Sequence, residues 1–219
     1  MINLDKKRDI YSVAIIFSIA MTSIGLLLWT FDFEILFFIQ NHIRNSFLDA
    51  VVPFYTNLGN DGIIWIVVGL VMLIPKKTRK CGIMVLGALL VMVVFNNLFL
   101  KNVFARPRPC ATYPEMVDLV HVPTSYSFPS GHTVSAMAVA FTILTQHKKL
   151  GIITLILAFL MGLTRLYVFV HFPTDVYCGI IVGAFIAIVV WYAEKKITPI
   201  ITEKLTKNTN KKPVKKHKK

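Results

Sequence analysis

The chain has 219 residues, of which 55% are hydrophobic and only 16% are charged, and its mean hydropathy is +0.64. A water-soluble domain of this size rarely carries so little charge, so the composition favours a multi-pass membrane protein with a single membrane domain. The formal net charge of +13 would suggest nucleic acid if it formed a patch on a soluble fold. Here the basic residues lie between apolar runs and in a C-terminal tail, so we expect topology signals and anionic lipid rather than a nucleic-acid partner.

Six apolar runs follow one another along the chain, at residues 11–31, 62–74, 82–100, 133–146, 151–170 and 176–193. Because a helix needs about 20 residues to cross the hydrocarbon core of a bilayer, the short second and fourth runs must extend into their outer flanks. These flanks are residues 56–61 and the Ser-Gly-His segment at 130–132. The pattern predicts an all-α, polytopic membrane protein whose six transmembrane helices form one bundle.

Two stretches do not fit as spans. Residues 33–54 mix apolar side chains with Glu34, His42, Arg44 and Asp49, which predicts an amphipathic helix lying at the membrane interface. The lysine-rich end of the chain, from Lys204 to Lys219, has the composition of a disordered segment. We therefore expect a transmembrane domain at 1–196 and a basic tail at 197–219 that either anchors the topology or contacts anionic lipid.

The distribution of Lys and Arg predicts the orientation. Nineteen of these residues fall on one side, in the N-terminus, the loops at 75–80 and 147–149 and the tail, whereas five fall on the other side. Cytoplasmic segments carry the excess of Lys and Arg, so both termini are expected in the cytoplasm, with the protein in the plasma membrane. The sequence has no Asn-x-Ser/Thr sequon, which favours a bacterial source.

Three short clusters in the second half of the chain carry the chemistry. With six spans, all three meet at the outer membrane face. Together they supply two histidines, one carboxylate and three cations, which is the set needed to cleave a phosphate ester without a metal. One histidine attacks phosphorus, and the carboxylate orients that histidine. The other histidine protonates the leaving oxygen, and the cations hold the phosphoryl oxygens. The clusters are Lys101 with Arg108-Pro109, then Pro129-Ser130-Gly131-His132, then Arg165 with His171 and Asp175.

This order of residues resembles the signature of the type 2 phosphatidic acid phosphatase superfamily, in which Lys-x6-Arg-Pro, Pro-Ser-Gly-His and Ser-Arg-x5-His-x3-Asp follow one another. The resemblance covers about residues 95–185, and its one departure is Thr164, which stands where the family has Ser and keeps the hydroxyl. It implies an integral-membrane lipid phosphatase that works through a phosphohistidine intermediate, with no metal and no other cofactor.

The resemblance also implies a role for each matched residue. His171 corresponds to the nucleophile, oriented by Asp175, and His132 to the general acid that later activates water. The phosphate-binding residues are expected to be Lys101, Arg108, Ser130, Gly131 and Arg165. Their chemistry agrees, because Arg grips phosphoryl oxygens bidentately, the start of a helix favours an anion, and a charge inside an apolar run, as at Arg165, is costly and usually functional.

Several alternatives remain open at this point. Arg106 could replace Arg108 in a shifted alignment, or could simply extend its charge to the interface. Thr174 or Asp175 is expected to cap the sixth helix. Cys110 and Cys178 could form a bridge on the outer side, although no cysteine pair has a spacing that indicates one.

A zinc site formed by His42 or His121 with the motif histidines lacks the tight spacing of metal ligands. Among substrates, undecaprenyl pyrophosphate is the first choice and phosphatidylglycerophosphate or phosphatidic acid the next, from the habits of small bacterial members of the family. A non-hydrolytic protein that binds or moves phospholipid is an alternative, and a vanadate-dependent peroxidase is another. The complete set of His132, His171 and Asp175 argues against mere binding, and the six apolar runs argue against a soluble peroxidase.

Overall fold

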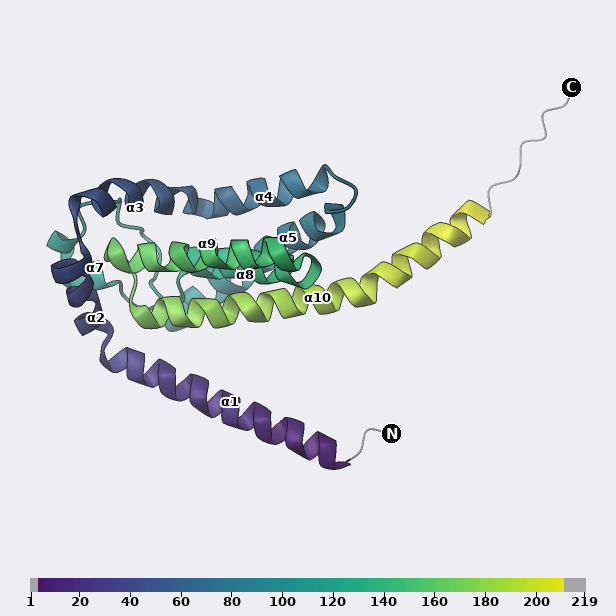
Figure 1. Cartoon of the computed structure of the whole chain (residues 1–219), viewed down its shortest axis with the longest axis horizontal. Coiled ribbons are helices and arrows are strands. Elements are labelled where there is room, and N and C mark those ends of the chain that lie inside the picture. The colour runs from purple at the N-terminus through teal and green to yellow at the C-terminus, as the bar shows by residue number, and fades with distance from the viewer. Residues whose placement is uncertain (1–3, 211–219) are drawn as a thin grey trace, which may run out of the picture.

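The computed structural model describes the backbone of residues 4–210, and the side chains of residues 15–200 except Phe17, together with Glu203. Every regular element in this range is a helix, which confirms the predicted all-α class. The long helices run along one axis, and short helices and loops gather at one end, on the left of Figure 1. All six predicted apolar runs lie in helices.

The first half of the chain is a series of helices separated by bends. α1 (Leu4–Thr30) is followed by α2 (Asp32–Phe38), the π-helical η1 (Ile39–Ile43), α3 (Ser46–Leu58), the short η2 (Asn60–Gly62) and α4 (Ile63–Leu73). The Asn45 side chain starts α3 by accepting a hydrogen bond from the backbone N–H of Leu48 at 3.1 Å. Between α3 and α4, Asp61 and Gly62 have φ angles of 52° and 71°, a left-handed conformation that interrupts the helix and that glycine adopts without a Cβ penalty.

The second half of the chain contains the most extensive helix packing. α5 (Arg79–Met92) continues through the π-helical η3 (Val93–Leu100) into α6 (Lys101–Phe104). A loop that contains the single turns α7 (Pro109–Thr112) and η4 (Pro114–Met116) leads to α8 (Gly131–Gln146), α9 (Lys148–Tyr167) and α10 (Pro173–Asn210). Proline occupies the first position of α10, where its missing N–H removes no helical hydrogen bond.

α8 forms the centre of the bundle. It packs against α5, α9 and α10, and all of its residues from 133 to 140 are buried. Glycines let its neighbours approach closely: a Cβ on Gly183 of α10 would lie 2.6 Å from the Cβ of Met137, and a Cβ on Gly151 of α9 would lie 2.3 Å from the Cα of Leu144. Close approach at small residues is typical of helix packing in membranes.

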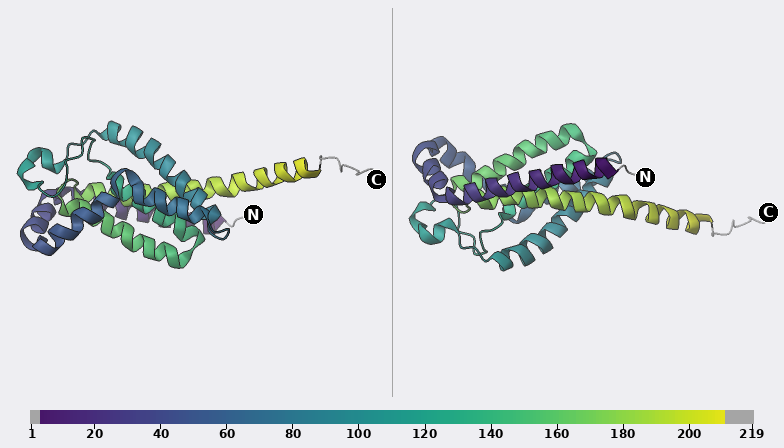
Figure 2. Two further views of the ribbon diagram at one scale, coloured as in Figure 1. Left: turned by 90° about the horizontal axis from the view of Figure 1, so that it is seen from above. Right: turned by 90° about the horizontal axis from the view of Figure 1, so that it is seen from below.

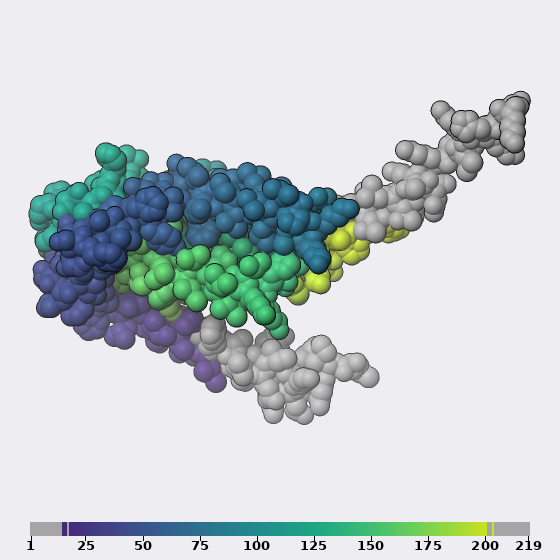
Figure 3. Space-filling model, turned by 45° about the horizontal axis from the view of Figure 1, so that its top comes forward, coloured from purple at the N-terminus to yellow at the C-terminus, as the bar shows by residue number. Residues whose placement is uncertain are grey.

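The remaining helices cover this centre from two sides. α4 packs against α5, and α3 packs against α9; Figure 3 shows the blue α3 and α4 beside the green α9 on one face of the molecule. α1 packs against α10, and the two lie side by side in the right-hand view of Figure 2. The residues of the three sequence clusters lie on α8, α9 and α10, on the short α6 that continues α5 through η3, and on the loops between these helices.

The described residues contain fewer candidate spans than the six that the sequence predicts. Three helices are long and apolar enough to cross a membrane, Arg79–Thr112, Lys148–Tyr167 and Pro173–Ile200, and the number rises to five if two bent pairs, Ser18–Ile43 and Ser46–Leu73, each count as one span. The bends in these pairs measure 63° and 49°. α8 has 16 residues, short of the ~20 that a straight span needs. The protein is multi-pass among its described residues, but six spans are not confirmed.

Two other predictions need correction. The stretch 33–54 is not one amphipathic helix but parts of α2, η1 and α3, because Arg44 and Asn45 adopt extended backbone conformations between them. The predicted disordered tail is helical up to Asn210, since α10 continues past residue 196 without a break; extending an existing helix adds one hydrogen bond per ordered residue and needs no new nucleus. Residues 211–219 lie outside the described part of the chain.

Candidate active site

The predicted site residues come together at the loop end of the bundle, on the left of Figure 1. They lie at the ends of helices or in the loops that join them, so elements far apart in the sequence each contribute one or two side chains. Lys101 opens α6, Arg108 precedes α7, Ser130, Gly131 and His132 start α8, Arg165 lies in the last turn of α9, His171 lies in the loop after it, and Asp175 lies in the first turn of α10.

The His171 side chain is buried, and its two ring nitrogens have different partners. Nε2 lies 3.1 Å from Nη1 of Arg108, whereas Nδ1 lies 3.3 Å from Oδ2 of Asp175 and 3.3 Å from Oγ of Ser127. Because a guanidinium group only donates hydrogen bonds, Nε2 is the acceptor and the ring proton is on Nδ1. The unprotonated Nε2 is therefore the nitrogen that has a lone pair available for attack.

The surroundings of His171 keep the imidazole neutral. Burial lowers its pKa well below the ordinary value of 6.5, and the positive charges of Arg108, Lys101, Arg165 and His132 lower the pKa further. A charged imidazole would have to share this space with several cations, so the neutral form is favoured near pH 7. A neutral imidazole held by a carboxylate is the form that can act as a nucleophile.

The loop that carries His171 contains a strained residue. Phe169 has a φ of 58°, a conformation that is rare for bulky residues and persists only where the surrounding structure enforces it. Its side chain is fully buried in a cluster with Leu36, Leu166 and Phe172. The packing of this cluster therefore holds the turn that presents the imidazole two residues later.

Three buried cations surround the imidazole without a carboxylate partner. The exposed fractions of Lys101, Arg108 and Arg165 are 6%, 7% and 2%, and among the residues that the structure describes none of the three has a carboxylate oxygen within salt-bridge distance. Lys101 donates to the carbonyl oxygen of Tyr126. Arg108 donates to the carbonyl oxygens of Ser125 and Val170, each at 2.8 Å. A buried charge that is not neutralised is costly, so this arrangement favours binding of an anion.

Arg165 has the least satisfied charge of the three. One guanidinium nitrogen donates to Oγ1 of Thr56 on α3, but the buried Nε atom has no hydrogen-bond partner. An N–H group left without a partner in a buried position is uncommon in native structures. The phosphoryl oxygens of a substrate could supply the missing acceptor.

The start of α8 lies beside these cations. Ser130 is the N-cap residue, and its backbone N–H donates to the carbonyl oxygen of Asp175 at 3.1 Å. A Cβ on Gly131 would lie 3.8 Å from Cε of Lys101, so the glycine and the lysine are neighbours. The Ser130 hydroxyl accepts a hydrogen bond from Thr133 at 3.1 Å. A helix start with free N–H groups and a cation alongside is a suitable environment for a phosphate.

His132 faces a segment that the sequence analysis did not connect with the site. Its Nε2 atom lies 3.0 Å from Oδ1 of Asn60, and a Cβ on Gly59 would lie 2.7 Å from its ring. The junction of α3 and α4 therefore packs directly against the second histidine. Asn60 and Thr56 were missed because both lie outside the three clusters; their only sequence signal is that polar residues interrupt the start of an apolar run.

Ser127 is a further residue that the pattern did not indicate. Its hydroxyl donates to Oδ2 of Asp175 and lies 3.3 Å from Nδ1 of His171, so it touches both members of the histidine and carboxylate pair. It is fully buried. Its position three residues before Ser130 was the available signal, since the chain must pass the site on its way into α8.

Arg106 is paired differently from the three buried cations. It forms ion pairs with Asp175 at 2.7 Å and with Asp32 at 2.6 Å, and it donates to Oγ1 of Thr174 at 2.7 Å. Its charge is thus neutralised by two carboxylates, in contrast to Arg108. The arginine that contacts His171 is Arg108, which the spacing from Lys101 favours over Arg106. Arg106 is held by two carboxylates, so it does not simply extend its charge to the interface.

The sequence predicted Thr174 or Asp175 at the cap of the sixth helix, but α10 begins with Pro173, so neither is the N-cap residue. Asp175 still caps the helix from its first turn, because its carboxylate accepts the N–H of Phe172 at 2.9 Å. The backbone N–H of Thr174 is instead satisfied by Asp32 from α2 at 3.0 Å. The carboxylate faces His171 because it turns back toward the preceding loop.

The cysteines are unpaired. Cys81, Cys110 and Cys178 are all free thiols, so the open possibility of a Cys110–Cys178 bridge is not realised. Within the described residues, no group of three His, Cys, Asp or Glu side chains is arranged to hold a metal ion. The site is thus built around a histidine, a carboxylate and cations.

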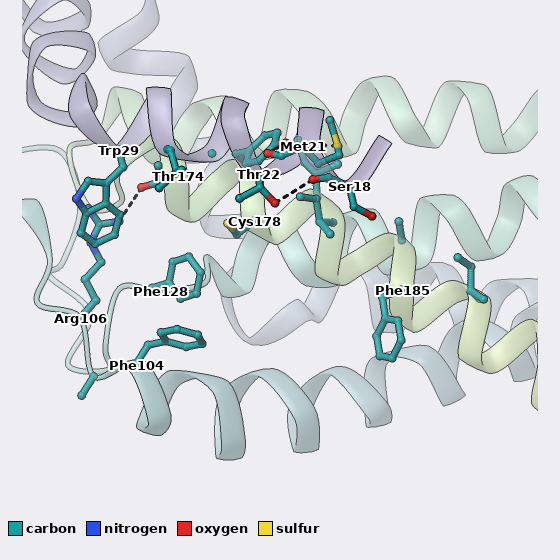
Figure 4. A pocket seen from close by; sticks show the side chains of 18 of the residues that line it. Ser18, Met21, Thr22, Trp29, Phe104, Arg106, Phe128, Thr174, Cys178 and Phe185 are labelled. Atoms are coloured by element: carbon teal, nitrogen blue, oxygen red, sulfur yellow. Dashed lines mark hydrogen bonds between the residues drawn. The ribbon is translucent and has the colours of Figure 1, made fainter. Parts of the chain in front are cut away.

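A large apolar groove begins beside this site. It has a volume of about 1100 Å³ and lies between α1, α6 and α10. Figure 4 shows Phe104 and Phe128 on one side, Met21 and Trp29 on another, and Cys178 and Phe185 along α10. Arg106 and Thr174 form its polar end, and Thr174 is the residue directly before Asp175. An apolar channel that ends next to a cluster of cations matches an amphiphile with a charged headgroup.

Comparison with known proteins is consistent with this arrangement. The model of the PAP2 superfamily matches residues 81–199, more than half of the chain. The chain is similar to the undecaprenyl-diphosphatase of Sulfolobus acidocaldarius, with 34% identity over 69% of this chain and 73% of that protein. It is similar also to the bacitracin transport permease protein BcrC of Bacillus licheniformis, with 32% identity over 70% of this chain and 75% of that protein.

A solved structure supports the same assignment. The crystal structure of a PAP2-type phosphatidylglycerolphosphate phosphatase from Bacillus subtilis superposes with a TM-score of 0.64 at 28% identity, and the match covers 82% of this chain and 96% of that chain. With more than half of its length matched by the family model, this chain belongs to the PAP2 superfamily and is a multi-pass membrane lipid phosphatase.

Proposed function

We propose that the protein hydrolyses lipid phosphates or pyrophosphates through a covalent phosphohistidine at His171, without a metal. The observation that carries this proposal is the trio of buried cations, Lys101, Arg108 and Arg165, which lie around a neutral imidazole and have no carboxylate partner in the described part of the chain. Such cations can neutralise phosphoryl charge as it develops in the transition state, the task that metal ions perform in other phosphatases.

The proposed reaction has two steps. In the first, Nε2 of His171 attacks phosphorus, the bond from phosphorus to the leaving oxygen breaks, and His132 gives that oxygen a proton. In the second, His132 takes a proton from water, the resulting hydroxide attacks the phosphohistidine, and the nitrogen–phosphorus bond breaks to release phosphate. Asp175 keeps the Nδ1 proton of His171 in place throughout.

The phosphoryl group would be held by Lys101, Arg108 and Arg165 together with Ser130 and the backbone at Gly131. This assignment is supported by the unpartnered Nε of Arg165 and by the contact between Gly131 and Lys101. Arginine matches phosphoryl oxygens in a planar, bidentate geometry, and lysine supplies a point charge.

The substrate that we favour is undecaprenyl pyrophosphate, followed by phosphatidylglycerophosphate and phosphatidic acid. The apolar groove of about 1100 Å³ supports a substrate with a long hydrocarbon chain. One similar protein is named an undecaprenyl-diphosphatase, which supports undecaprenyl pyrophosphate. Another is named a phosphatidylglycerolphosphate phosphatase, which supports phosphatidylglycerophosphate.

A non-hydrolytic lipid binder or transporter is the second candidate, and the name of the bacitracin transport permease protein favours it. Pure binding requires only the cations and the groove. It gives no reason for a neutral histidine held between a carboxylate and an arginine, which is why hydrolysis is the stronger proposal.

The test is phosphate release by the purified protein in detergent, from a panel of lipid phosphates and pyrophosphates, in the presence of EDTA. Turnover in EDTA supports the proposal. Binding without release would favour the transporter. Loss of activity in EDTA that Mg²⁺ restores when it is added to the protein would contradict a metal-independent reaction.

We also propose that the site opens on the extracytoplasmic face, with both termini in the cytoplasm and the basic residues after Glu194 beside the anionic inner leaflet. The excess of Lys and Arg on the other side supports this orientation. Single cysteines near His121 and near Lys77, on a background without the native cysteines, would test it with a membrane-impermeant thiol reagent. Labelling of the first position alone in intact cells is expected, and labelling of the second alone would reverse the topology.

A further inference from the structure

Arg106 and Asp32 form a buried ion pair at the boundary between the site and the groove. Asp32 is 4% exposed and lies at the start of α2, a helix outside all three sequence clusters. Its Oδ2 atom accepts from Nη2 of Arg106 at 2.6 Å and from Oγ1 of Thr174 at 2.6 Å, and its Oδ1 atom accepts from the backbone N–H of Thr174 at 3.0 Å. All the polar contacts of this carboxylate therefore go to residues that adjoin the catalytic pair.

The guanidinium of Arg106 is also held in place by aromatic contacts, in addition to its hydrogen bonds with Asp32. It lies 4.1 Å from the centre of the Trp29 ring and 3.9 Å from the centre of the Phe172 ring, so its faces are covered by two aromatic side chains. Figure 4 shows it beside Trp29 and Thr174 at the polar end of the groove. Contacts of this kind strengthen when the cation is desolvated. The group has little freedom to turn toward a ligand.

The two carboxylate oxygens of Asp175 have different partners: one accepts a hydrogen bond from Arg106, and the other contacts His171 and its neighbours. Nη1 of Arg106 donates to Oδ1 at 2.7 Å, whereas Oδ2 accepts from Ser127, from the N–H of Phe172 at 2.9 Å, and from His171 at 3.3 Å. The carboxylate plane is thereby fixed from both sides. Rotation of this plane would move the oxygen that holds Nδ1–H of the imidazole.

From this arrangement we propose that Arg106 and Asp32 are positioning residues for the reaction. They hold the carboxylate of Asp175 in the orientation that directs Nε2 of His171 toward phosphorus, and they do not bind phosphate themselves. The inference rests on the proposed function. It assigns opposite tasks to Arg106 and Arg108, which stand two residues apart: the arginine with two carboxylate partners is committed to the protein, and the arginine with none is left for the substrate.

Arg106 and Asp32 are both needed because their charges balance each other beside Asp175. Without Arg106, the buried carboxylates of Asp32 and Asp175 would both lie beside Thr174 with no cation between them, and their repulsion would favour protonation or displacement of one of them. Without Asp32, Arg106 would keep its bond to Asp175 but lose the anchor that sets its angle. Substituting both residues removes the repulsion together with the anchor.

The experiment measures kcat and KM for Arg106→Gln, Asp32→Asn and the double variant, in detergent, on one long-chain and one short-chain phosphate substrate. We expect Arg106→Gln to lower kcat by about 10- to 100-fold, the range found when a partner that orients a catalytic group is lost, with KM within about threefold of the parent on both substrates. The double variant should be more active than Arg106→Gln alone, since neighbouring charges couple non-additively. Arg106→Lys should recover part of the lost kcat.

Binding of inorganic vanadate separates these effects from misfolding and from phosphate binding. Both single variants should bind vanadate within about threefold of the parent, whereas Arg108→Gln should not. Arg79→Gln, an arginine that donates to the carbonyl oxygen of Leu73 at the opposite end of the bundle, is the matched control and should leave kcat unchanged.

Three results would overturn the inference while leaving the proposed function intact: parental kcat in Arg106→Gln, a rise in KM with vanadate binding lost in the same variant, or a double variant no more active than Arg106→Gln. Absence of phosphate release by the parent protein from every substrate in the panel would instead overturn the proposed function, and the inference with it.

Discussion

At the loop end of the bundle, Lys101, Arg108 and Arg165 are buried and have no carboxylate partner among the described residues, whereas the groove beside α1 is lined mainly by apolar side chains. The two regions adjoin each other, since Thr174 lines the groove and Asp175 holds His171. The two regions also differ in how firmly their surrounding helices are packed. The charged end, by which we mean the buried cations with His171 and Asp175, adjoins α8, α9 and α10, which pack extensively. One wall of the groove is α1, which packs against α10.

This difference indicates a division of labour between the two regions. Fixed charges on rigid helices can recognise a phosphoryl group with little reorganisation, because that group is the same in every lipid phosphate. A wide apolar groove supplies binding energy in proportion to the apolar area that it covers, with little dependence on chemical detail. Substitutions at the charged end should therefore affect all phosphate esters alike, and substitutions in the groove should discriminate by chain length.

Loss of the nucleophile should have the largest effect. His171→Ala is expected to lower kcat by several orders of magnitude on long-chain and short-chain substrates alike, because the covalent step is removed. Phosphate-release assays check this, and vanadate binding shows that the pocket is intact. His121→Ala, a change at an exposed loop histidine, is the control and should have no effect. Activity of His171→Ala within tenfold of the parent would rule out the nucleophile assignment.

Substitution of one of the three buried cations should have the second-largest effect on activity. Arg165→Met is expected to reduce kcat/KM by about 10²- to 10³-fold on all esters, the range found when one donor to a developing negative charge is removed. Vanadate affinity, measured by isothermal titration, should fall in the same variant. Arg44→Met is a useful comparison, because Arg44 is paired with Asp49 and Asp118, and it should keep vanadate affinity. Equal effects of the two substitutions would break the distinction between paired and unpaired arginines.

A change in the groove should have a smaller and selective effect. Cys178→Trp places a large ring in the channel and is expected to raise KM for a long-chain substrate by about tenfold, which corresponds to about 1.4 kcal/mol of lost apolar contact. KM for a short-chain phosphate should stay unchanged. Ile153→Trp on α9, at an exposed apolar position outside the groove, controls for the added ring. A matching loss on the short substrate would mean that the groove is not a separate binding region.

The smallest effect concerns pH. Because the pKa of His171 lies well below its ordinary value of 6.5, the imidazole should remain neutral, with its proton on Nδ1, at pH 5.5. NMR of protein labelled with ¹⁵N-histidine, assigned with His171→Gln, measures this directly. Since the unfolded chain binds a proton near pH 6.5 and the native state does not, stability should fall as the pH drops below that value, by at most about 1.4 kcal/mol per pH unit. A protonation midpoint of 6.5 or higher would contradict the account.

Much of the charged end could be predicted from the sequence because its residues interrupt apolar runs or cluster beside Pro and Gly. Arg165 lies within an apolar run, where a charge has few explanations, and the spacing from Lys101 distinguished Arg108 from Arg106. The helices were predictable for a related reason, since an apolar run of sufficient length has no better structure in a membrane than a helix.

The rest depends on tertiary contacts that no local pattern records. Asp32, Ser127 and Asn60 contact partners 44 to 142 positions away, so their importance appears only once the helices are packed. Six spans are not confirmed because α8 has only 16 residues, and because residues 46–73 count as one span only across a bend of 49°, at the left-handed Asp61 and Gly62. Hydropathy reports burial in an apolar environment and not the direction of the helix axis.

The central claim is that the charged end forms a covalent phosphohistidine at His171, and trapping that intermediate tests it most directly. His132→Ala should still be phosphorylated by an aryl phosphate, whose leaving group needs no proton, but should hydrolyse the intermediate slowly because water is not activated. Brief incubation, alkaline quench and mass spectrometry of the peptides should then find the phosphoryl group on His171, with none in the variant that also carries His171→Gln. A phosphoryl group on another residue, or a label that persists in the double variant, would contradict the account.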